Sequence, residues 1–563
     1  MLKSSGAMAA ATLLSRVLGM VREIVYANFM GDGWVAGAFQ FAFTIPNLFR
    51  RLLGEGALTA AFIPIFKEKE KIHGEREMWR AANAVISGLI ISASVIIAVV
   101  MIGIGLALPL VKNAKPQPVV LQTNNPTIEN ELLYQNYIQS KTNLDFDGQF
   151  KTKTEIKWEQ TVLLLQLLRV MFPYMMLVCL AAAFMGMLNA RGHFFIPAMG
   201  ATMLNIVMIA SVLWLAPKFG AQLHEQIFAL AYGVLAAGVA QAAFQLPTLW
   251  HDGFRYEWVS PLKNETVRLV VTRMIPGTIG VAAFQLNVTL VLAVAFWVSP
   301  QIVASFNYAV RLMELPQGMF GISLATYLLP TLSGLAAEKK YPEFRATLRH
   351  GVGSLLFLNL IAATLLVVLA EPIVRLIYEH GKFDADSTIR TMRALQCLAP
   401  GLVAFSTVNI LARAFYALGD TKTPMKISIF CLALNLILAV ALVQPLRQAG
   451  LGIANTATSI CNVGLLFFAL QKKLGKLEME SLQKTLLPLI LGGLVAGTVA
   501  WCGWQFWEDK FGHNTIALKI GAVFVPAIAA GLIYGMLALA FKVPASKEML
   551  DFALQKFRAK AQS

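Results

Sequence analysis

Charged side chains lie inside segments of this sequence that are otherwise apolar enough to cross a membrane. The stretch from Phe43 to Phe62, FTIPNLFRRLLGEGALTAAF, contains Arg50 and Arg51 and then Glu55 between two glycines. Insertion scales assign each central arginine a cost of about 2.5–3.5 kcal/mol, whereas each leucine or phenylalanine returns only a few tenths. Pro46 and the Gly-Glu-Gly sequence favour a discontinuous helix that lines a polar cavity. The alternative is two helix ends joined by a short surface loop, with both arginines reaching back to the water.

Two further apolar segments carry charges of the same kind. Arg16 and Glu23 are seven residues apart and share one helix face, whereas Arg22 points about 120° away at 100° per residue. Arg311 and Glu314 are three residues apart and can pair on one face. In each case a structural explanation is available, because Arg22 and Glu23 can lie near a helix end and Arg311 and Glu314 can form a structural ion pair.

The balance of these charges indicates the chemistry of a ligand. Five arginines against three glutamates leave a surplus of positive charge, which suits a phosphate or diphosphate because guanidinium groups present paired donors to its oxygens. An acidic cavity would instead indicate cationic drugs. The candidate substrate-binding residues are Arg16, Arg22, Arg50, Arg51 and Arg311, and the candidate acidic or gating residues are Glu23, Glu55 and Glu314.

No catalytic or metal-binding motif accompanies these residues. The sequence contains no G-x-x-x-x-G-K-[ST], H-E-x-x-H or G-x-S-x-G pattern, and its five cysteines lie in apolar runs without CxxC pairing. We therefore expect a transporter rather than an enzyme, with no cofactor and no metal site.

The composition is that of a polytopic membrane protein. The 563 residues are 57% hydrophobic and only 14% charged, with a mean hydropathy of +0.63. The net charge of +16 does not indicate nucleic-acid binding, because the basic residues fall in alternate short loops. This pattern predicts that both termini are cytoplasmic. No cleavage site follows the first apolar run, so we expect that helix to be retained.

Apolar runs of about 20 residues predict an all-α membrane protein with about fourteen transmembrane helices. We expect them near residues 7–29, 34–66 (broken), 80–111, 160–189, 194–216, 225–250, 265–298, 301–336 (broken), 346–379, 388–418, 424–444, 449–471, 484–507 and 515–542.

An internal repeat groups these helices. The segment 45–49, IPNLF, resembles 315–319, LPQGM, and the segment 189–193 before Pro197 resembles 417–422 before Pro424. The two motifs of the first half are about 43 residues further apart along the chain than the two motifs of the second half. This difference is close to the length of the polar stretch that lies between the motifs of the first half. Because six is an even number, two six-helix halves would form a parallel repeat about an axis along the membrane normal.

The repeat predicts four parts of the chain. They are an N-terminal lobe over 1–250 with a polar external insertion at 112–160, a C-terminal lobe over 251–475, two further helices over 476–545, and a cytoplasmic amphipathic tail over 546–563.

Several motifs resemble those of the MurJ or MviN lipid II flippases of the MOP exporter superfamily. The resemblance covers nearly the whole chain except 112–160. It rests on SRVLGMVRE (15–23), PNLFRRLLGEGAL (46–58), FPYMML (172–177), YAVRLMELPQG (308–318), GKF (381–383) and ARAFYALGDTKTP (412–424).

The resemblance implies a monomeric flippase of the bacterial inner membrane that carries lipid II, the undecaprenyl-diphosphate-linked peptidoglycan precursor, to the periplasmic leaflet by alternating access. It further implies two lobes around a cationic cavity containing the charged residues named above, and a groove for the lipid tail in 476–545. The driving force would be the membrane potential or an ion gradient, with the ion undetermined. Gly37 and Val310 stand where the family often has Asp, which puts any coupling role of those carboxylates in doubt.

Three alternatives stay open from the sequence. One is another MOP-type exporter, either an oligosaccharide-lipid flippase or a cation-coupled drug exporter. A polytopic undecaprenyl-phosphate glycosyltransferase would also need arginines at membrane depth, but it should carry an acidic cluster outside the membrane. The last is a membrane scaffold without transport activity.

Overall fold

A computed structural model describes residues 2–54, 57–116, 153–475 and 480–548, together with 550, 551 and 555. Within these ranges the chain forms helices and connecting turns and no β-strand. It divides into two compact units. Unit 1 comprises residues 1–22 and 33–281, and unit 2 comprises residues 23–32 and 282–563.

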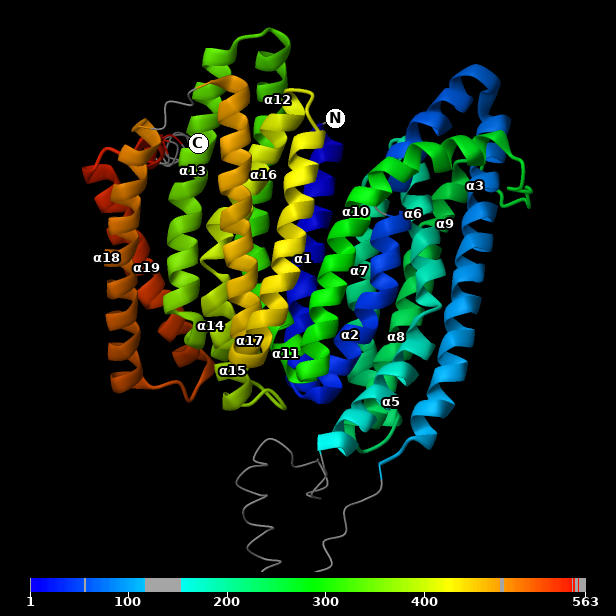
Figure 1. Cartoon of the computed structure of the whole chain (residues 1–563), viewed down its shortest axis with the longest axis horizontal. Helices are drawn as coiled ribbons and strands as arrows, with labels where there is room; N and C mark the ends of the chain where they lie inside the picture. Colours follow the sequence, from blue (N-terminus) through cyan, green and yellow to red (C-terminus); the bar gives the residue numbers. More distant parts are fainter. Residues whose placement is uncertain are drawn as a thin grey trace, which may run out of the picture. The chain divides into compact units, whose positions relative to one another are not determined.

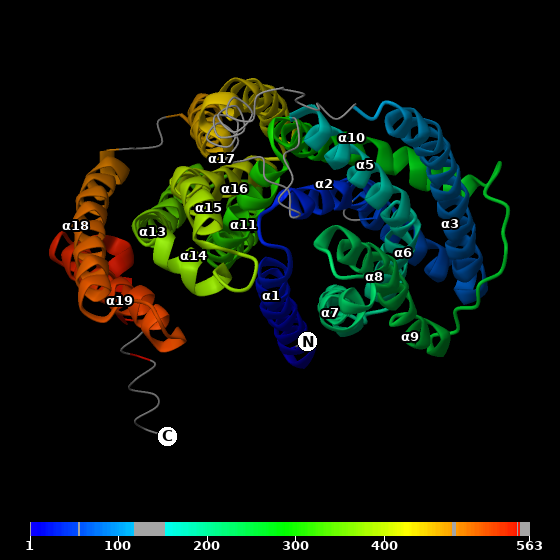
Figure 2. The same ribbon diagram turned by 90° about the horizontal axis from the view of Figure 1, so that it is seen from below.

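Unit 1 is a bundle in which α3 packs on α6 and α7 packs on α8 (Figures 1 and 2). Gly74, with φ of 83°, interrupts α3 and divides it into two helices. The elements are the first part of α1 (Leu2–Met30), α2 (Trp34–Phe49), the π-helix η1 (Arg50–Gly54), α3 (Ala57–Asn113), α5 (Lys153–Met171), α6 (Tyr174–Ala190), α7 (Phe195–Ala210), η2 (Ser211–Leu215), η3 (Ala216–Lys218), α8 (Leu223–Ala243), α9 (Leu246–His251) and the first half of α10 (Glu265–Val298).

In unit 2 the helices α13 and α16 pack together, and the hairpin of α18 and α19 lies against α13 (Figure 2). Arg447, with φ of 50°, divides α17 into two helices. The remaining elements are α11 (Pro300–Pro316), the π-helix η4 (Gln317–Ile322), α12 (Ser323–Ala337), α13 (Tyr341–Val368), α14 (Ala370–Tyr378), α15 (Ala385–Leu398), α16 (Gly401–Ala417), α17 (Lys422–Leu474), α18 (Glu480–Phe511) and α19 (Ile516–Ala540).

The helices confirm the expected class of an all-α, multi-pass membrane protein. Among the described residues, eight helices are long and apolar enough to cross a membrane, or up to ten when each of two bent pairs counts as one span. The total of fourteen stays a prediction. Residues 117–152, which are most of the polar insertion, and most of the C-terminal tail lie outside the described residues.

The same irregularities recur in the two units, in the order that a duplication predicts. The π-helix η1 follows Pro46 in unit 1, and the π-helix η4 follows Pro316 in unit 2. The pair α5 and α6 bends by 40° at Pro173, and the pair α15 and α16 bends by 44° at Pro400. Proline removes a backbone donor and clashes with the preceding turn, so it interrupts a helix at the same place in each copy. The two predicted broken helices are confirmed as helices interrupted by π-helical segments.

Residues 23–32, at the end of α1 and the turn after it, are part of unit 2. The hydroxyl of Tyr308 donates to the carbonyl of Gly31 (3.1 Å), and the backbone N–H of Lys382 donates to the carbonyl of Asn28 (3.0 Å). Arg390 binds the carboxylate of Asp32, which is only 2% exposed, through Nε (2.7 Å) and Nη2 (2.8 Å). The GKF motif therefore has a structural function, because its backbone holds this segment in place.

Candidate functional site

The predicted site residues are distributed over both units. Unit 1 contains Arg16, Arg22, Arg50 and Arg51, whereas unit 2 contains Glu23, Arg311 and Glu314. Glu55 lies outside the described residues. The convergence of all five arginines on one chamber therefore stays a prediction.

In unit 1 the helix break positions two arginines at the same point. Arg50 and Arg51 are the first two residues of η1, directly after α2, and both are half-buried. Asn47 accepts a hydrogen bond from Nε of Arg50 through Oδ1 at 2.7 Å, so it orients this guanidinium. The sequence predicted the break and the two arginines but not the part played by Asn47. Its place one helical turn before Arg50 could have indicated the contact.

In unit 2, Arg311 lies between two carboxylates. Its Nη1 is 2.8 Å from Oε2 of Glu314, and its Nε is 3.6 Å from Oε1 of Glu23. The predicted pair of Arg311 and Glu314 is therefore confirmed, and the end of α1 adds a second acid. Glu23 is only 7% exposed, whereas the side chains of Arg311 and Glu314 are 45% and 47% exposed. This triad has one positive and up to two negative charges, so Arg311 can bind an anion only if a carboxylate releases it or becomes protonated.

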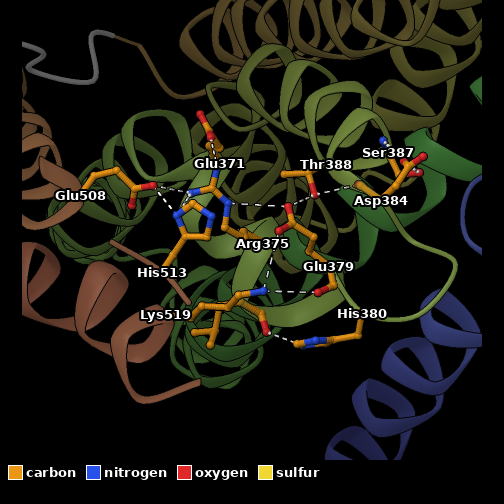
Figure 3. A network of polar contacts seen from close by, with 11 residues as sticks. Glu371, Arg375, Glu379, His380, Asp384, Ser387, Thr388, Glu508, His513 and Lys519 are labelled. Carbon is orange, nitrogen blue, oxygen red and sulfur yellow. Dashed lines mark hydrogen bonds and ion pairs between the residues drawn. The ribbon is translucent and has the colours of Figure 1, made fainter. Parts of the chain in front are cut away.

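A polar network in unit 2, which the sequence analysis did not single out, has Arg375 at its centre (Figure 3). Its guanidinium contacts Glu371 of α14 (2.5 Å), Glu508 of α18 (3.1 Å) and Glu379 at the end of α14 (3.6 Å). His513, in the turn before α19, bonds to Glu508. The network therefore connects α14 to the hairpin of α18 and α19. The sequence signal was the i, i+4 spacing of Glu371, Arg375 and Glu379.

Unit 2 also contains an apolar groove of about 1170 Å³. Side chains of α13, α16, α17 and α18 form most of its walls, with Gln396 of α15, and within the described part of the chain α19 contributes none of its lining residues. Arg345 and Arg349 of α13 lie at one end, and Trp501 and Trp504 of α18 line it further along. The groove involves one of the two helices in which a lipid-tail groove was expected.

The sequence model described as "Lipid II flippase MurJ" matches residues 26–120 and 150–521. The "Probable lipid II flippase MurJ" of Rhizobium tropici is 31% identical over 531 residues, which are 94% of this chain and 92% of that protein. The "Lipid II flippase MurJ" of Burkholderia cenocepacia is 31% identical over 532 residues, which are 93% of this chain and 95% of that protein. The chain belongs to the MurJ family.

Solved structures agree with this membership at the level of the fold. A MurJ structure in an inward closed conformation superimposes with a TM-score of 0.71 at 21% identity, covering 96% of this chain and 99% of that one. An inward-facing MATE family transporter of the MOP superfamily gives 0.61 at 13% identity, covering 84% and 98%. The residues between the two matched stretches of the MurJ sequence model, 121–149, lie within the polar insertion.

Proposed function

We propose that this chain is a lipid II flippase, which moves the undecaprenyl-diphosphate-linked peptidoglycan precursor from the cytoplasmic to the periplasmic leaflet of the bacterial inner membrane. The observation that carries the proposal is the match to the MurJ sequence model over most of the chain, within which Arg50 and Arg51 begin a π-helical break in an apolar helix. A diphosphate loses its hydrogen bonds to water when it enters such a site, so guanidinium groups must supply hydrogen bonds in their place.

The charge of each unit separates two tasks for the arginines. Arg16, Arg22, Arg50 and Arg51 give unit 1 a large positive surplus over Glu55, so these residues bind the diphosphate. Arg311 is held by Glu23 and Glu314 and exchanges a carboxylate for a phosphate oxygen as the substrate arrives. Gly37 and Val310 offer no carboxylate for ion coupling, which leaves these two glutamates as the acids that respond to the substrate.

The transport cycle is alternating access by a monomeric unit with both termini in the cytoplasm. The interrupted helices at η1 and η4 supply the flexible gates, because a π-helical segment has weaker internal hydrogen bonding than the helix on either side. The loaded site carries little net charge, whereas the empty site returns with positive charge. Reset is therefore the step that the membrane potential drives.

The test is depletion of this protein in its own cells, followed by assignment of lipid II to a leaflet. We expect lipid II to accumulate in the cytoplasmic leaflet, and Arg50→Ala to reproduce this result at normal protein levels. Arg80→Ala is a matched control, because Arg80 lies outside the candidate site and forms an exposed pair with Glu77 at 3.4 Å. Unchanged lipid II distribution after depletion would reject the function and would favour another exported substrate.

A further inference from the structure

The two halves of α17 form a helix hairpin within unit 2. Arg447 interrupts the helix, and a Cβ at Gly450 would lie only 2.2 Å from the carbonyl oxygen of Leu442. Further from the turn, the thiols of Cys431 and Cys461 are hydrogen-bonded to each other. Each cysteine is 11 residues along the chain from the contact at the turn, so both contacts belong to one antiparallel register.

The register also turns both cysteines toward the partner helix. Eleven residues at 100° each make three full turns and about 20° more, so each cysteine lies on the face that makes the contact at the turn. Ala439 and Ala454, which are both fully buried, lie on the same sides between the two contacts. Small side chains allow helices to approach closely. The two thiols therefore meet because of the backbone register, and not because of one side-chain rotamer alone.

The surroundings of this thiol pair, Cys431 and Cys461, disfavour any net charge. Cys431 is only 2% exposed, and Cys461 is half-buried. The apolar runs on either side of the turn place the turn at a membrane face. Eleven residues at 1.5 Å each put the thiols about 17 Å from it, near the middle of a hydrocarbon core about 30 Å thick. A ligand held there must leave the site neutral.

We propose that Cys431 and Cys461 form a binding site for one soft, two-coordinate divalent metal ion, for which Hg(II) is the probe. Two thiolates neutralise a divalent ion, whereas Cu(I) would leave one negative charge in the membrane. Zinc takes four ligands. The described part of the chain contains no group of three or more His, Cys, Asp or Glu that could provide such a set.

The geometry of the pair fits a linear ion. A metal–thiolate bond is about 2.3 Å long, so an ion between two sulfurs holds them about 4.6 Å apart. This separation is slightly more than that of two hydrogen-bonded thiols, and small rotations about χ1 provide the difference. The sequence did not indicate the pair, because cysteines 30 residues apart match no metal-binding motif.

Binding exchanges protons for the metal ion. With mercuric chloride, each thiol loses its proton and two Hg–S bonds replace two Hg–Cl bonds, which releases two protons and two chloride ions. No oxidant is required, because sulfur and mercury keep their oxidation states. Mercuric chloride is uncharged, so it can cross hydrocarbon and reach the pair from the side of Cys461, the more exposed of the two.

The test uses the full-length protein in nanodiscs of phosphatidylcholine, with mercuric chloride as the probe. Replacing Cys179, Cys397 and Cys502 by Ala gives a pair-only protein, in which Cys431 and Cys461 are the remaining cysteines. We expect intact-mass spectrometry to show one Hg in place of two hydrogens per chain. We also expect the melting temperature to rise, because the ion binds the folded state. No bound Hg, or two Hg per chain, would overturn the proposal.

A one-thiol protein provides the matched control. A chain that keeps only Cys502, which is exposed, gives the affinity of a single thiol. The pair-only protein should bind Hg(II) at least a hundredfold more tightly, because its second bond forms at a high effective concentration. Cys431→Ala in the pair-only protein should reduce the affinity to that of the single thiol. Equal affinities of the pair-only and one-thiol proteins would overturn the site.

A measurement on the unsubstituted background covers the case in which the pair-only protein does not fold. Cys431→Ala should remove the most tightly bound Hg(II) of the wild-type chain, whereas Cys502→Ala should leave it in place. Retention of that ion in Cys431→Ala would contradict the proposal. A disulfide between Cys431 and Cys461 in protein isolated from cells, detected as a mass two hydrogens lower, would also overturn it, because no thiol would remain to bind the metal.

Discussion

At the scale of single residues, the surroundings of each arginine decide what its charge can do. The spacing of Arg311 and Glu314 predicted their ion pair, because residues three apart on a helix face each other. The approach of Glu23 could not be predicted, since it is 288 positions away and depends on where the end of α1 packs. The sum of charges over the sequence therefore overstated the positive charge that Arg311 can offer to an anion. Among the eight candidate residues, the whole positive surplus belongs to unit 1, because unit 2 has one arginine and two glutamates.

We expect Arg311→Ala to weaken substrate binding about ten- to a hundredfold, the usual effect of losing one charge-assisted hydrogen bond. Arg311→Lys should restore only part of this loss, because an ammonium group cannot form the paired contacts of a guanidinium. The measurement is growth of a depletion strain that expresses each variant at wild-type levels. Full growth of the alanine variant would contradict a binding role for Arg311.

Asp420, in the turn before α17, gives a prediction about pH. Its carboxylate accepts hydrogen bonds from Nζ of Lys473 (2.8 Å) and from the backbone N–H of Thr423 (3.0 Å), and these contacts hold the pKa of Asp420 well below its usual value. A depressed pKa stabilises the folded state above the unfolded pKa of about 3.9, and this contribution disappears as the pH falls through the folded pKa.

Asp420→Asn should therefore lower the melting temperature of the protein in detergent by a few degrees at pH 7. The difference from the wild type should shrink when both are measured at pH 3, because the carboxylate of the unfolded chain is then largely protonated and the folded state has lost part of its electrostatic advantage. A constant difference at the two pH values would indicate that the effect is not electrostatic.

At the scale of secondary-structure elements, prolines explain the helix breaks, and contacts distant in sequence explain the rest. Pro46 and the glycines after Arg51 predicted the first break, because both residue types disfavour a continuous helix. The bend at Pro400 was not predicted, since the sequence analysis placed a single helix over 388–418 and a proline does not by itself give the angle of a bend. Hydropathy indicates how much of a segment can lie in lipid, but it does not predict the direction of the helix axis.

Gly381 tests the contact that holds the end of α1 in unit 2. It has φ of 60°, and a Cβ there would lie 1.9 Å from Oδ1 of Asn28. Gly419 has φ of 74°, but no atom of the described residues lies within 4 Å of its Cβ position. Both alanine variants incur backbone strain of about 1 kcal/mol, and only Gly381→Ala adds a clash. Thermal unfolding should therefore show a larger loss for Gly381→Ala, and equal losses would contradict the close packing.

Arg375 tests the attachment of the hairpin of α18 and α19. Its side chain is only 15% exposed, and Arg375→Met would leave three nearby glutamates without their guanidinium. Breaking a buried ion pair from one side costs about 3–5 kcal/mol. We expect faster amide hydrogen exchange in α19 than in wild type, with Arg80→Met as an exposed control. Unchanged exchange in α19 would show that apolar packing alone holds the hairpin.

At the scale of the whole molecule, composition alone predicted the class. A chain that is 57% hydrophobic with basic residues in alternate loops must cross the membrane many times. The assignment of residues 23–32 to unit 2 could not be predicted, because nothing in the apolar pattern of α1 distinguishes its two ends. Both units contain a π-helical break after a proline and a bent helix pair, while the duplication inferred from the motifs at 45–49 and 315–319 stays a prediction.

The membrane potential should act on the reset step of transport. A charge that crosses the full field gains about 2.3 kcal/mol per 100 mV, so removing the potential slows the return of the empty, positively charged site. We expect a cysteine introduced by Leu52→Cys, next to Arg51 in η1, to react more with a periplasmic reagent after the potential is dissipated. Unchanged labelling would reject a voltage-driven reset.

The placement of Asp32 sets an order of assembly on the ribosome. This carboxylate is synthesised 358 residues before its guanidinium partner, Arg390. Until then the acid must keep water or a temporary partner, because burying an uncompensated charge is costly. Unit 2 is therefore completed by a segment that is synthesised about 250 residues before the rest of it, and a fragment that starts after residue 32 would lack a piece of its own interior.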